Sequence, residues 1–403
     1  MAANFNVGSF NKIKTDDTND TKNVDDASKN SSSSHKNDDG FKKRIMIFII
    51  IVIGIVLVLF LVVFLLSFFT NRNLSYSEIE DVMTNAAVSY FEDHPNRLPE
   101  STTQRVEIDV DTLVAEEYMK DLTTYTGEEV SCSGKVSVKM NGDDYLYIPE
   151  LECGDDYQTQ ALKDVLTENV VTNGYGLYQV GNSYVFRGED VRNYLQLDQS
   201  LWRIVKITET GDFVLILEDE VTPSVPWDDR YNSTVGYSIG INDYAASRIK
   251  DTLEDLYHSK DEESMILSDN DRSRLVPFDL CIGKRDEAST AVDNSLECNS
   301  TLPDQNIGLL TASDYMVASI DPNCTTITNR ACQNYNYLAA DYEWWLITGL
   351  SNSTSNVFGV DRIGVGTSEA ASSYMAPRAV VVLDGDALYQ SGRGTLNKPY
   401  KIK

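Results

Sequence analysis

The longest apolar run in the chain predicts a membrane-spanning helix. Residues 45–69 are 25 consecutive uncharged and almost wholly apolar residues. As a helix they would extend over roughly 37 Å, enough to cross a hydrocarbon core of about 30 Å with some tilt. A buried core helix of this length would normally have a polar face, and a cleavable signal peptide would be shorter. We therefore expect 45–69 to contact the lipid bilayer as a transmembrane helix.

The polar residues on either side of this run predict its orientation. Residues 42–44 are Lys-Lys-Arg and precede it directly, whereas only Arg72 follows it closely. Because basic residues stay preferentially in the cytoplasm, we expect a single-pass signal anchor in the cell membrane, with a cytoplasmic N-terminus and an extracellular C-terminal domain. Residues 1–44 have few apolar positions, which predicts a disordered cytoplasmic tail.

Helical periodicity resumes soon after the apolar run. Apolar positions recur at helical spacing over 77–93, where Ser77 and Glu80 have the spacing of a capping box. A second, shorter helix is expected over 111–119. These two helices would lie close to the membrane.

A β-hairpin is predicted next. Two strand patterns, over 134–140 and 145–151, flank a polar turn. With a tight turn, Cys132 lies directly opposite Cys153, so a disulfide is expected between them, although another register would shift the pair by a residue or two. Closing this loop would stabilise the fold by about 3 kcal/mol.

The patterns divide the region after the run into three parts. We expect a membrane-proximal domain over 70–160, a connector over 161–174 and a β-rich extracellular domain over 175–403, giving an α+β fold. The last part has a helical pattern over 243–257 and a further short helix starting at Thr311 or Ser313. Its strand-like runs, separated by turns rich in Gly, Asn and Asp, are 183–187, 201–207, 213–217, 276–282, 344–348, 357–360 and 379–383.

Charge narrows the classes of partner. The tail has 8 basic and 7 acidic residues, and the remaining 26 basic and 55 acidic residues give the chain after position 44 a net charge of −29. A surface this acidic repels nucleic acid, so no nucleic-acid partner is expected.

All six cysteines follow the apolar run, which indicates disulfides in an oxidising compartment. Six cysteines allow 15 pairings. Besides the hairpin pair, local pairing in chain order predicts Cys281–Cys298 and Cys324–Cys332. Buried free thiols are the alternative.

A metal site has weak support in the sequence. No C-x-x-C motif is present, and His94 and His258 are the only histidines after the run. Pairs of aspartates are frequent, but none has the EF-hand spacing, so a bound Ca²⁺ stays an open alternative and no cofactor is expected.

Tryptophan offers the clearest candidates for a binding surface. Alternation along a strand would place one ring of Trp344-Trp345 inward and the other outward, where it could stack on a sugar or contact a protein. Trp227, with Asp228 and Arg230, could form a polar binding edge. The alternatives are rings packed in the core and an Asp-Arg pair that fixes a turn.

Residues 45–160 resemble a pilin or pseudopilin in architecture: an apolar helix that continues into an amphipathic one, then a small disulfide-closed sheet. The prepilin signal is a Gly-Phe junction followed by an apolar stretch with a Glu. Here 40–41 is Gly-Phe, but Lys-Lys-Arg follows at 42–44. The resemblance therefore implies a permanently anchored, pilin-like stalk.

A further resemblance of residues 175–403 is carried by the segments 201–205, 227–232, 307–315, 344–348, 377–383 and 391–400. Together they resemble a recurrent domain of bacterial surface proteins that is distantly similar to the C-type-lectin and formylglycine-generating-enzyme fold. The resemblance implies a lectin-like fold and a surface location.

Taken together, these patterns predict a membrane-anchored binding or adhesion protein of the cell envelope with an unidentified extracellular protein or glycan ligand. Catalysis is not expected, because no G-x-S-x-G, H-E-x-x-H or phosphate-binding motif is present. The alternatives are a minor pilin-like component of an assembly machine and an enzyme of the formylglycine-generating type.

Overall fold

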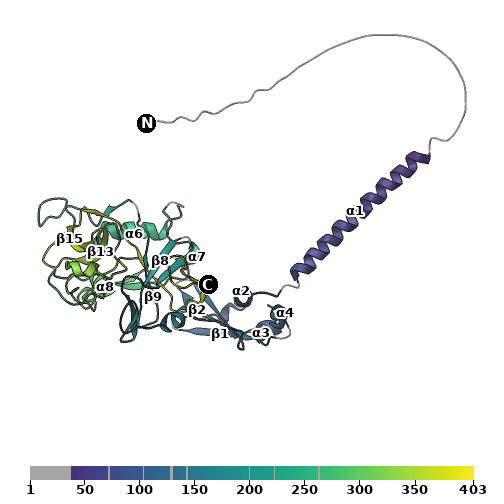
Figure 1. Ribbon diagram of the computed structural model, residues 1–403, viewed down its shortest axis with the longest axis horizontal. Helices are drawn as coiled ribbons and strands as arrows, with labels where there is room; N and C mark the ends of the chain where they lie inside the picture. The colour runs from purple at the N-terminus through teal and green to yellow at the C-terminus, as the bar shows by residue number, and fades with distance from the viewer. Residues whose placement is uncertain are drawn as a thin grey trace, which may run out of the picture. The chain divides into compact units, whose positions relative to one another are not determined.

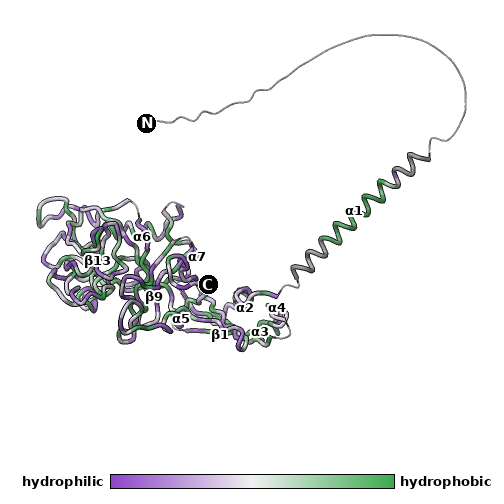
Figure 2. Tube along the Cα trace, in the orientation of Figure 1, coloured by the Kyte–Doolittle hydropathy of each residue, from purple (hydrophilic) through white to green (hydrophobic). Residues whose placement is uncertain are grey.

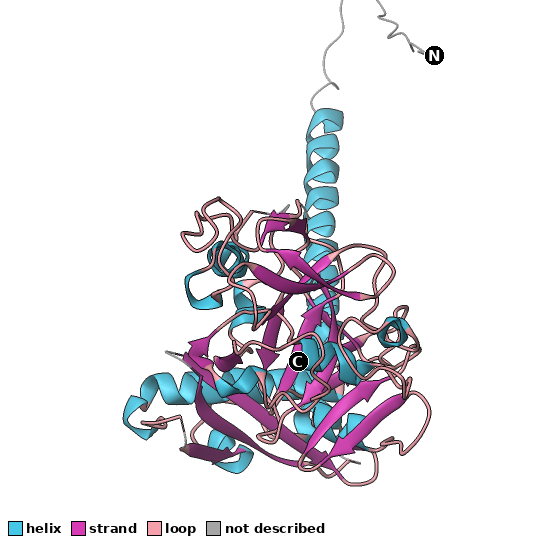
Figure 3. Ribbon diagram, turned by 90° about the vertical axis from the view of Figure 1, so that its left-hand side faces the viewer, coloured by secondary structure: helices cyan, strands magenta, loops and turns pink. Residues whose placement is uncertain are grey.

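The computed structural model (Figure 1) describes residues 38–70, 73–102, 104–127, 130–141, 144–198, 200–221, 223–261 and 264–403. The chain divides into two units, residues 1–72 and 73–403, which are described separately below. The expected α+β class is confirmed, since strands dominate and the helices of the second unit are short (Figure 3).

The first unit contains the long helix α1 (Asp38–Thr70). It begins seven residues before the expected span of 45–69 and so includes the last residues of the expected tail, whose boundary at residue 44 stays a prediction; residues 1–37 lie outside the described part of the chain. Side chains 46–61 are largely exposed, for example 62% for Leu57, and Figure 2 shows their apolar character in green. Among the residues described, no helix is found that has the length and apolar character needed to cross a membrane.

The second unit begins with a small α/β part built on one antiparallel sheet of order β1-β2-β3-β4. Its apolar side chains, between Ile79 and Cys153, form a cluster that we call the small core. The elements are α2 (Tyr76–Asp93), η1 (Pro95–Arg97), β1 (Arg105–Asp109), α3 (Val110–Ala115), α4 (Thr123–Thr126), β2 (Ser133–Asn141), β3 (Asp144–Cys153) and β4 (Tyr157–Gln158).

The β2–β3 hairpin has the predicted register. Met140 pairs with Tyr145 and Ser133 with Glu152, so the next positions outward are Cys132 and Cys153. Alternate residues of β2 face α2, and Val136 and Val138 are fully buried there. Strand β1, which the sequence did not predict, extends the hairpin to a sheet.

The helix expected over 77–93 begins earlier. Ser75, not Ser77, is the N-cap of α2, and it forms a capping box with Glu78. Glu80 is instead fully buried and accepts hydrogen bonds from Tyr157 and Thr159. The shorter helix expected over 111–119 ends at Ala115.

The rest of the unit surrounds a larger sheet of order β17-β9-β8-β7-β19-β18, to which the β5–β6 hairpin is joined through β8. Strands β7 and β19 are parallel, whereas the other pairs are antiparallel. This sheet comprises β5 (Gly176–Val180), β6 (Ser183–Arg187), β7 (Tyr194–Leu197), β8 (Ser200–Ile207), β9 (Phe213–Leu217), β17 (Val380–Leu383), β18 (Tyr389–Ser391) and β19 (Tyr400–Ile402).

Smaller sheets and short helices complete this part and share with the larger sheet one apolar cluster, between Leu162 and Ile402, which we call the large core. The sheets are β10 (Val225–Pro226) with β16 (Tyr374–Met375), β11 (Phe278–Cys281) with β12 (Thr301–Gln305), and β13 (Trp344–Gly349), β14 (Asn356–Val360) and β15 (Gly366–Ala370). The helices are α5 (Leu162–Thr167), η2 (Tyr244–Ala246), α6 (Arg248–His258), α7 (Asp269–Arg272), η3 (Glu297–Asn299), α8 (Ala312–Ala318) and η4 (Arg330–Gln333).

The helix expected over 243–257 is split in the structure. A short 3-10 turn, η2, is followed by α6, whose N-cap is Ser247. Of the two starts expected for the next helix, α8 uses Thr311, whose hydroxyl accepts the backbone N–H of Asp314. The proposed division at residues 160 and 175 stays a prediction; α5 lies inside the expected connector.

Candidate functional site

The tryptophans expected at a binding surface lie in the large core. Trp227, Trp344 and Trp345 have no exposed surface, so the expectation that one ring of the Trp344-Trp345 pair faces solvent is wrong. Alternation fails because β13 is covered on both faces. The indole N–H of Trp227 donates to the Leu346 carbonyl at 3.1 Å, and that of Trp345 to the Val225 carbonyl at 2.9 Å.

Asp228 and Arg230 form the turn-fixing pair that was the alternative to a binding edge. Asp228 is fully buried and accepts hydrogen bonds from Arg230 Nε at 2.8 Å and from the Ile241 backbone N–H at 2.8 Å. This carboxylate closes the loop from 228 to 241, and because it is fully buried it is inaccessible to a ligand.

All three expected disulfides are confirmed: Cys132–Cys153, Cys281–Cys298 and Cys324–Cys332. The alternative of buried free thiols is therefore wrong. In the described part of the chain, no group of three or more His, Cys, Asp or Glu side chains is arranged to hold a metal ion; Asp143, one of the paired aspartates, lies outside that part.

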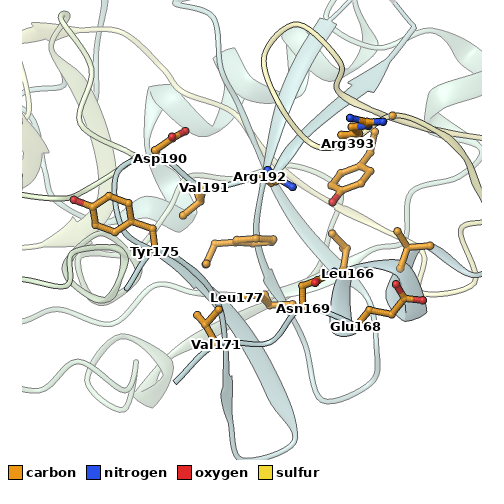
Figure 4. Close-up of a pocket in the computed structure, with 15 residues that line it drawn as sticks. Leu166, Glu168, Asn169, Val171, Tyr175, Leu177, Asp190, Val191, Arg192 and Arg393 are labelled. Atoms are coloured by element: carbon orange, nitrogen blue, oxygen red, sulfur yellow. The ribbon is translucent and has the colours of Figure 1, made fainter. Parts of the chain in front are cut away.

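A cavity of about 500 Å³ beside the β5–β6 hairpin brings together charged and aromatic side chains that the sequence did not single out (Figure 4). We call it the arginine pocket. In Figure 4, Tyr175 and Asp190 lie toward one side, Arg393 and Glu168 toward the other, and Arg192 between them. The remaining lining residues are Val165, Leu166, Asn169, Val171, Gly176, Leu177, Phe186, Val191, Gly392 and Tyr400.

The parallel pairing of β7 with β19 explains how two distant arginines reach this cavity. Arg192 lies just before β7 and Arg393 in the loop between β18 and β19. The Tyr194 N–H donates to the Gly394 carbonyl at 3.0 Å, so the two segments lie side by side. Gly394 has φ of 67°, and a Cβ there would lie 2.6 Å from the Arg192 carbonyl oxygen, so only glycine permits this approach.

The two arginines differ electrostatically from most others in the second unit. Both side chains are exposed, and neither forms an ion pair or side-chain hydrogen bond with any residue whose placement is described. In contrast, Arg378 bonds to Glu218 and Arg362 to Glu343. Burial and the nearby Tyr389 raise the pKa of Tyr400, and the positive charge of Arg192 opposes that rise. Glu168 and Asp190 also line the cavity, so its lining is formally neutral, but neither arginine is paired with a carboxylate among the described residues.

Two tyrosines form an aromatic rim beside the pocket. Tyr175 is 41% exposed and Tyr335 49%, and their ring centroids are 6.1 Å apart. The Tyr175 ring packs on Gly188, where a Cβ would lie 2.5 Å from a ring carbon. Tyr335 has φ of 50°, which is a strained conformation for a bulky side chain and is found preferentially at functional sites.

Sequence reasoning missed every charged residue of this pocket. Arg393 lies in the 391–400 segment that was noticed for its resemblance, and its two flanking glycines were the only local signal. Nothing in the sequence connects it with Arg192, about 200 positions away.

No protein-family model, no curated protein and no solved structure matches the chain. The site therefore rests on its own geometry.

Proposed function

We propose that this protein is a membrane-anchored binding protein of the cell surface, with the arginine pocket as its ligand site. In this proposal 45–69 anchors the chain in the membrane, residues 1–44 stay in the cytoplasm and the region from residue 73 faces outward. The small α/β part serves as a pilin-like stalk and the β-rich part as a lectin-like head.

The observation that carries the binding function is the pair Arg192 and Arg393. The chain after position 44 has 55 acidic and 26 basic residues, so two arginines that line one cavity without a carboxylate partner differ from the acidic surface around them. Two arginines without such partners, at a cavity of ligand size, are typical of a recognition site.

The three disulfides and the exposed apolar surface of α1 support the location. Disulfides persist in oxidising compartments outside the cytoplasm. An apolar surface as continuous as that of residues 46–61 is rare in contact with water and is covered by lipid in this proposal.

Two measurements test the proposal. Protease added to intact cells should remove the region after residue 73 and leave the N-terminal tail intact. The full chain in detergent micelles should bind at least one member of a combined glycan and protein array. Protection of the second unit in intact cells, or a complete lack of binding, would contradict it.

A further inference from the structure

We infer that the arginine pocket binds a carboxylate-bearing sugar, so that the head recognises acidic glycans. This inference rests on the proposed binding function and adds the chemical class of the ligand.

The two guanidinium groups of the pocket favour a ligand with a carboxylate. Each presents a planar fork of N–H donors that fits a carboxylate with two parallel hydrogen bonds. Arg192 and Arg393 both line the cavity, so an anion bound there would be attracted by their positive charges. The protein's own carboxylates in the pocket, Glu168 and Asp190, form no ion pair within 4 Å with either arginine among the described residues.

The arrangement of the loop holds this charge in place. Gly392 has φ of 106° and a Cβ there would lie 2.0 Å from the Pro399 carbonyl oxygen, and the Arg393 N–H donates to the Lys398 carbonyl at 2.9 Å. These contacts fix the backbone on both sides of Arg393. The loop therefore fixes the backbone from which the Arg393 side chain extends before any ligand arrives, which lowers part of the entropy cost of binding.

The sugar is indicated by the rest of the lining. The exposed rings of Tyr175 and Tyr335 offer flat apolar faces on which the C–H face of a pyranose ring can pack. Glu168, Asp190 and Asn169 supply oxygens that accept hydrogen bonds from sugar hydroxyls. A simple inorganic anion would use the arginines and leave these other groups without a role.

The negative net charge of the chain affects which acidic ligands can bind. With 55 acidic residues after position 44, the surface repels polyanions at long range. Binding of an acidic glycan then depends on the short-range contacts in the pocket. Low salt should strengthen both the long-range repulsion by the acidic surface and the short-range attraction by the arginines. We therefore expect the two arginines to contribute to binding at low and at high ionic strength.

The test measures binding of oligogalacturonate and sialyllactose to the full chain in detergent micelles by isothermal titration calorimetry. Oligogalacturonate whose carboxylates are methyl-esterified is the neutral control. We expect Arg192→Gln and Arg393→Gln each to weaken binding of the bound acid by about tenfold, and Tyr175→Ala by about fivefold.

Two control variants keep the result interpretable. Arg330→Gln removes the charge of another exposed arginine for which no side-chain partner is described, and Tyr374→Ala removes a tyrosine that is 68% exposed. Neither residue lines the arginine pocket, and both variants should bind as the unaltered chain does. An unchanged melting temperature of all variants shows that they are folded.

Three outcomes would overturn the inference. Equal binding of the methyl ester and the free acid would leave a binding protein without charge selection, so the proposed function would survive. Equal loss in Arg330→Gln and Arg393→Gln would show a general charge effect. Failure of both acids to bind would reject the ligand class, whereas failure of the proposed function requires that nothing on the array binds.

Discussion

Asp314 is a single residue whose ionisation stabilises the larger part of the second unit. Its carboxylate is 2.8 Å from Lys206 Nζ and 2.9 Å from Asn294 Nδ2, and the Thr311 hydroxyl lies 2.9 Å from its other oxygen. Burial alone would raise its pKa, but the Lys206 charge and these hydrogen bonds lower the pKa below the ordinary value for aspartate. The folded state therefore favours the ionised carboxylate more than the unfolded state does.

A pH dependence follows from this shift. The pKa of Asp314 is lower in the folded state than in the unfolded state. The contribution of its carboxylate to the free energy of unfolding is therefore complete above the unfolded pKa of about 3.9 and is lost as the pH falls through the lower folded pKa. We expect Asp314→Asn to lower the melting temperature at pH 7 and to have a smaller effect below about pH 3. Thermal unfolding at both pH values checks this. Asp255→Asn, at an exposed position of α6, is the control. If Asp314→Asn lowered the melting temperature equally at both pH values, the prediction would be contradicted.

Arg285 and Glu297 form a fully buried ion pair. Arg285 Nη1 is 2.9 Å from Glu297 Oε1, both side chains have no exposed surface, and Ser313 bonds to both. Removing one partner leaves an uncompensated buried charge. We expect Glu297→Ala to lower the free energy of unfolding by about 3–5 kcal/mol in urea titrations, and Arg285→Met with Glu297→Leu to cost less than Glu297→Ala alone. A double variant that loses more than the single one would contradict this account.

Where a strand was predicted from the sequence, its limits agree with the structure better than the predicted helix starts do. The runs 183–187 and 213–217 match β6 and β9 exactly in their limits, because alternation or a continuous apolar run is a local property. Strands β1 and β15 were missed because they lie at sheet edges and carry polar residues, so their neighbours, not their own pattern, make them strands.

Helix α2 shows why its start was misplaced. Ser75 with Glu78 and Ser77 with Glu80 both have the spacing of a capping box. The tertiary structure decides between them, because Glu80 is used by Tyr157 and cannot serve as a cap. No local pattern distinguishes the two candidates.

The two serines give a matched test at the scale of this helix. We expect Ser75→Ala to lower the free energy of unfolding by about 1 kcal/mol, because the variant loses the N-cap hydrogen bond that the hydroxyl accepts from the Glu78 N–H. Ser77→Ala, within the first turn, should change it by less than about 0.5 kcal/mol. Chemical denaturation measures both, and equal effects would mean that the cap does not act as described.

At the scale of the whole second unit, the small and large cores are joined by ion pairs. Lys403, directly after β19, pairs with the buried Glu80 of α2. Lys139, in β2, bonds to Asp384 at 2.7 Å and also to Asp386. These contacts connect residues more than 240 positions apart. No sequence pattern indicates them, because charge pairs at such separation have no local signal.

The arginine pocket was invisible in the sequence for the same reason. Its two cations are brought together by a parallel strand pair that closes late in the chain. The tryptophans, which the sequence did suggest, were misleading because a large aromatic side chain beside polar residues is equally common in a core.

The Lys403–Glu80 pair provides the prediction at this scale. We expect Lys403→Met to lower the free energy of unfolding by about 3 kcal/mol, since the Glu80 carboxylate would stay buried without its cation. Adding Glu80→Gln should recover part of the loss. Unfolding in urea checks this. It is followed by tryptophan fluorescence, which reports only on the large core and its surroundings, and by far-ultraviolet circular dichroism. A loss of less than 1 kcal/mol would show that the pair is dispensable.

The place of β19 in the larger sheet has a consequence for biosynthesis. It lies between β7 and β18, and its residues 400–402 are made some 200 residues after β7. During translation the edge of β7 that pairs with β19 therefore stays unpaired until residue 402 has left the ribosome. Until then this edge is accessible to chaperones and to incorrect pairing partners. Completion of the sheet, and with it the arginine pocket, thus follows the synthesis of β7 by some 200 residues, and ribosomes that stop before residue 400 would release a product with an open sheet edge.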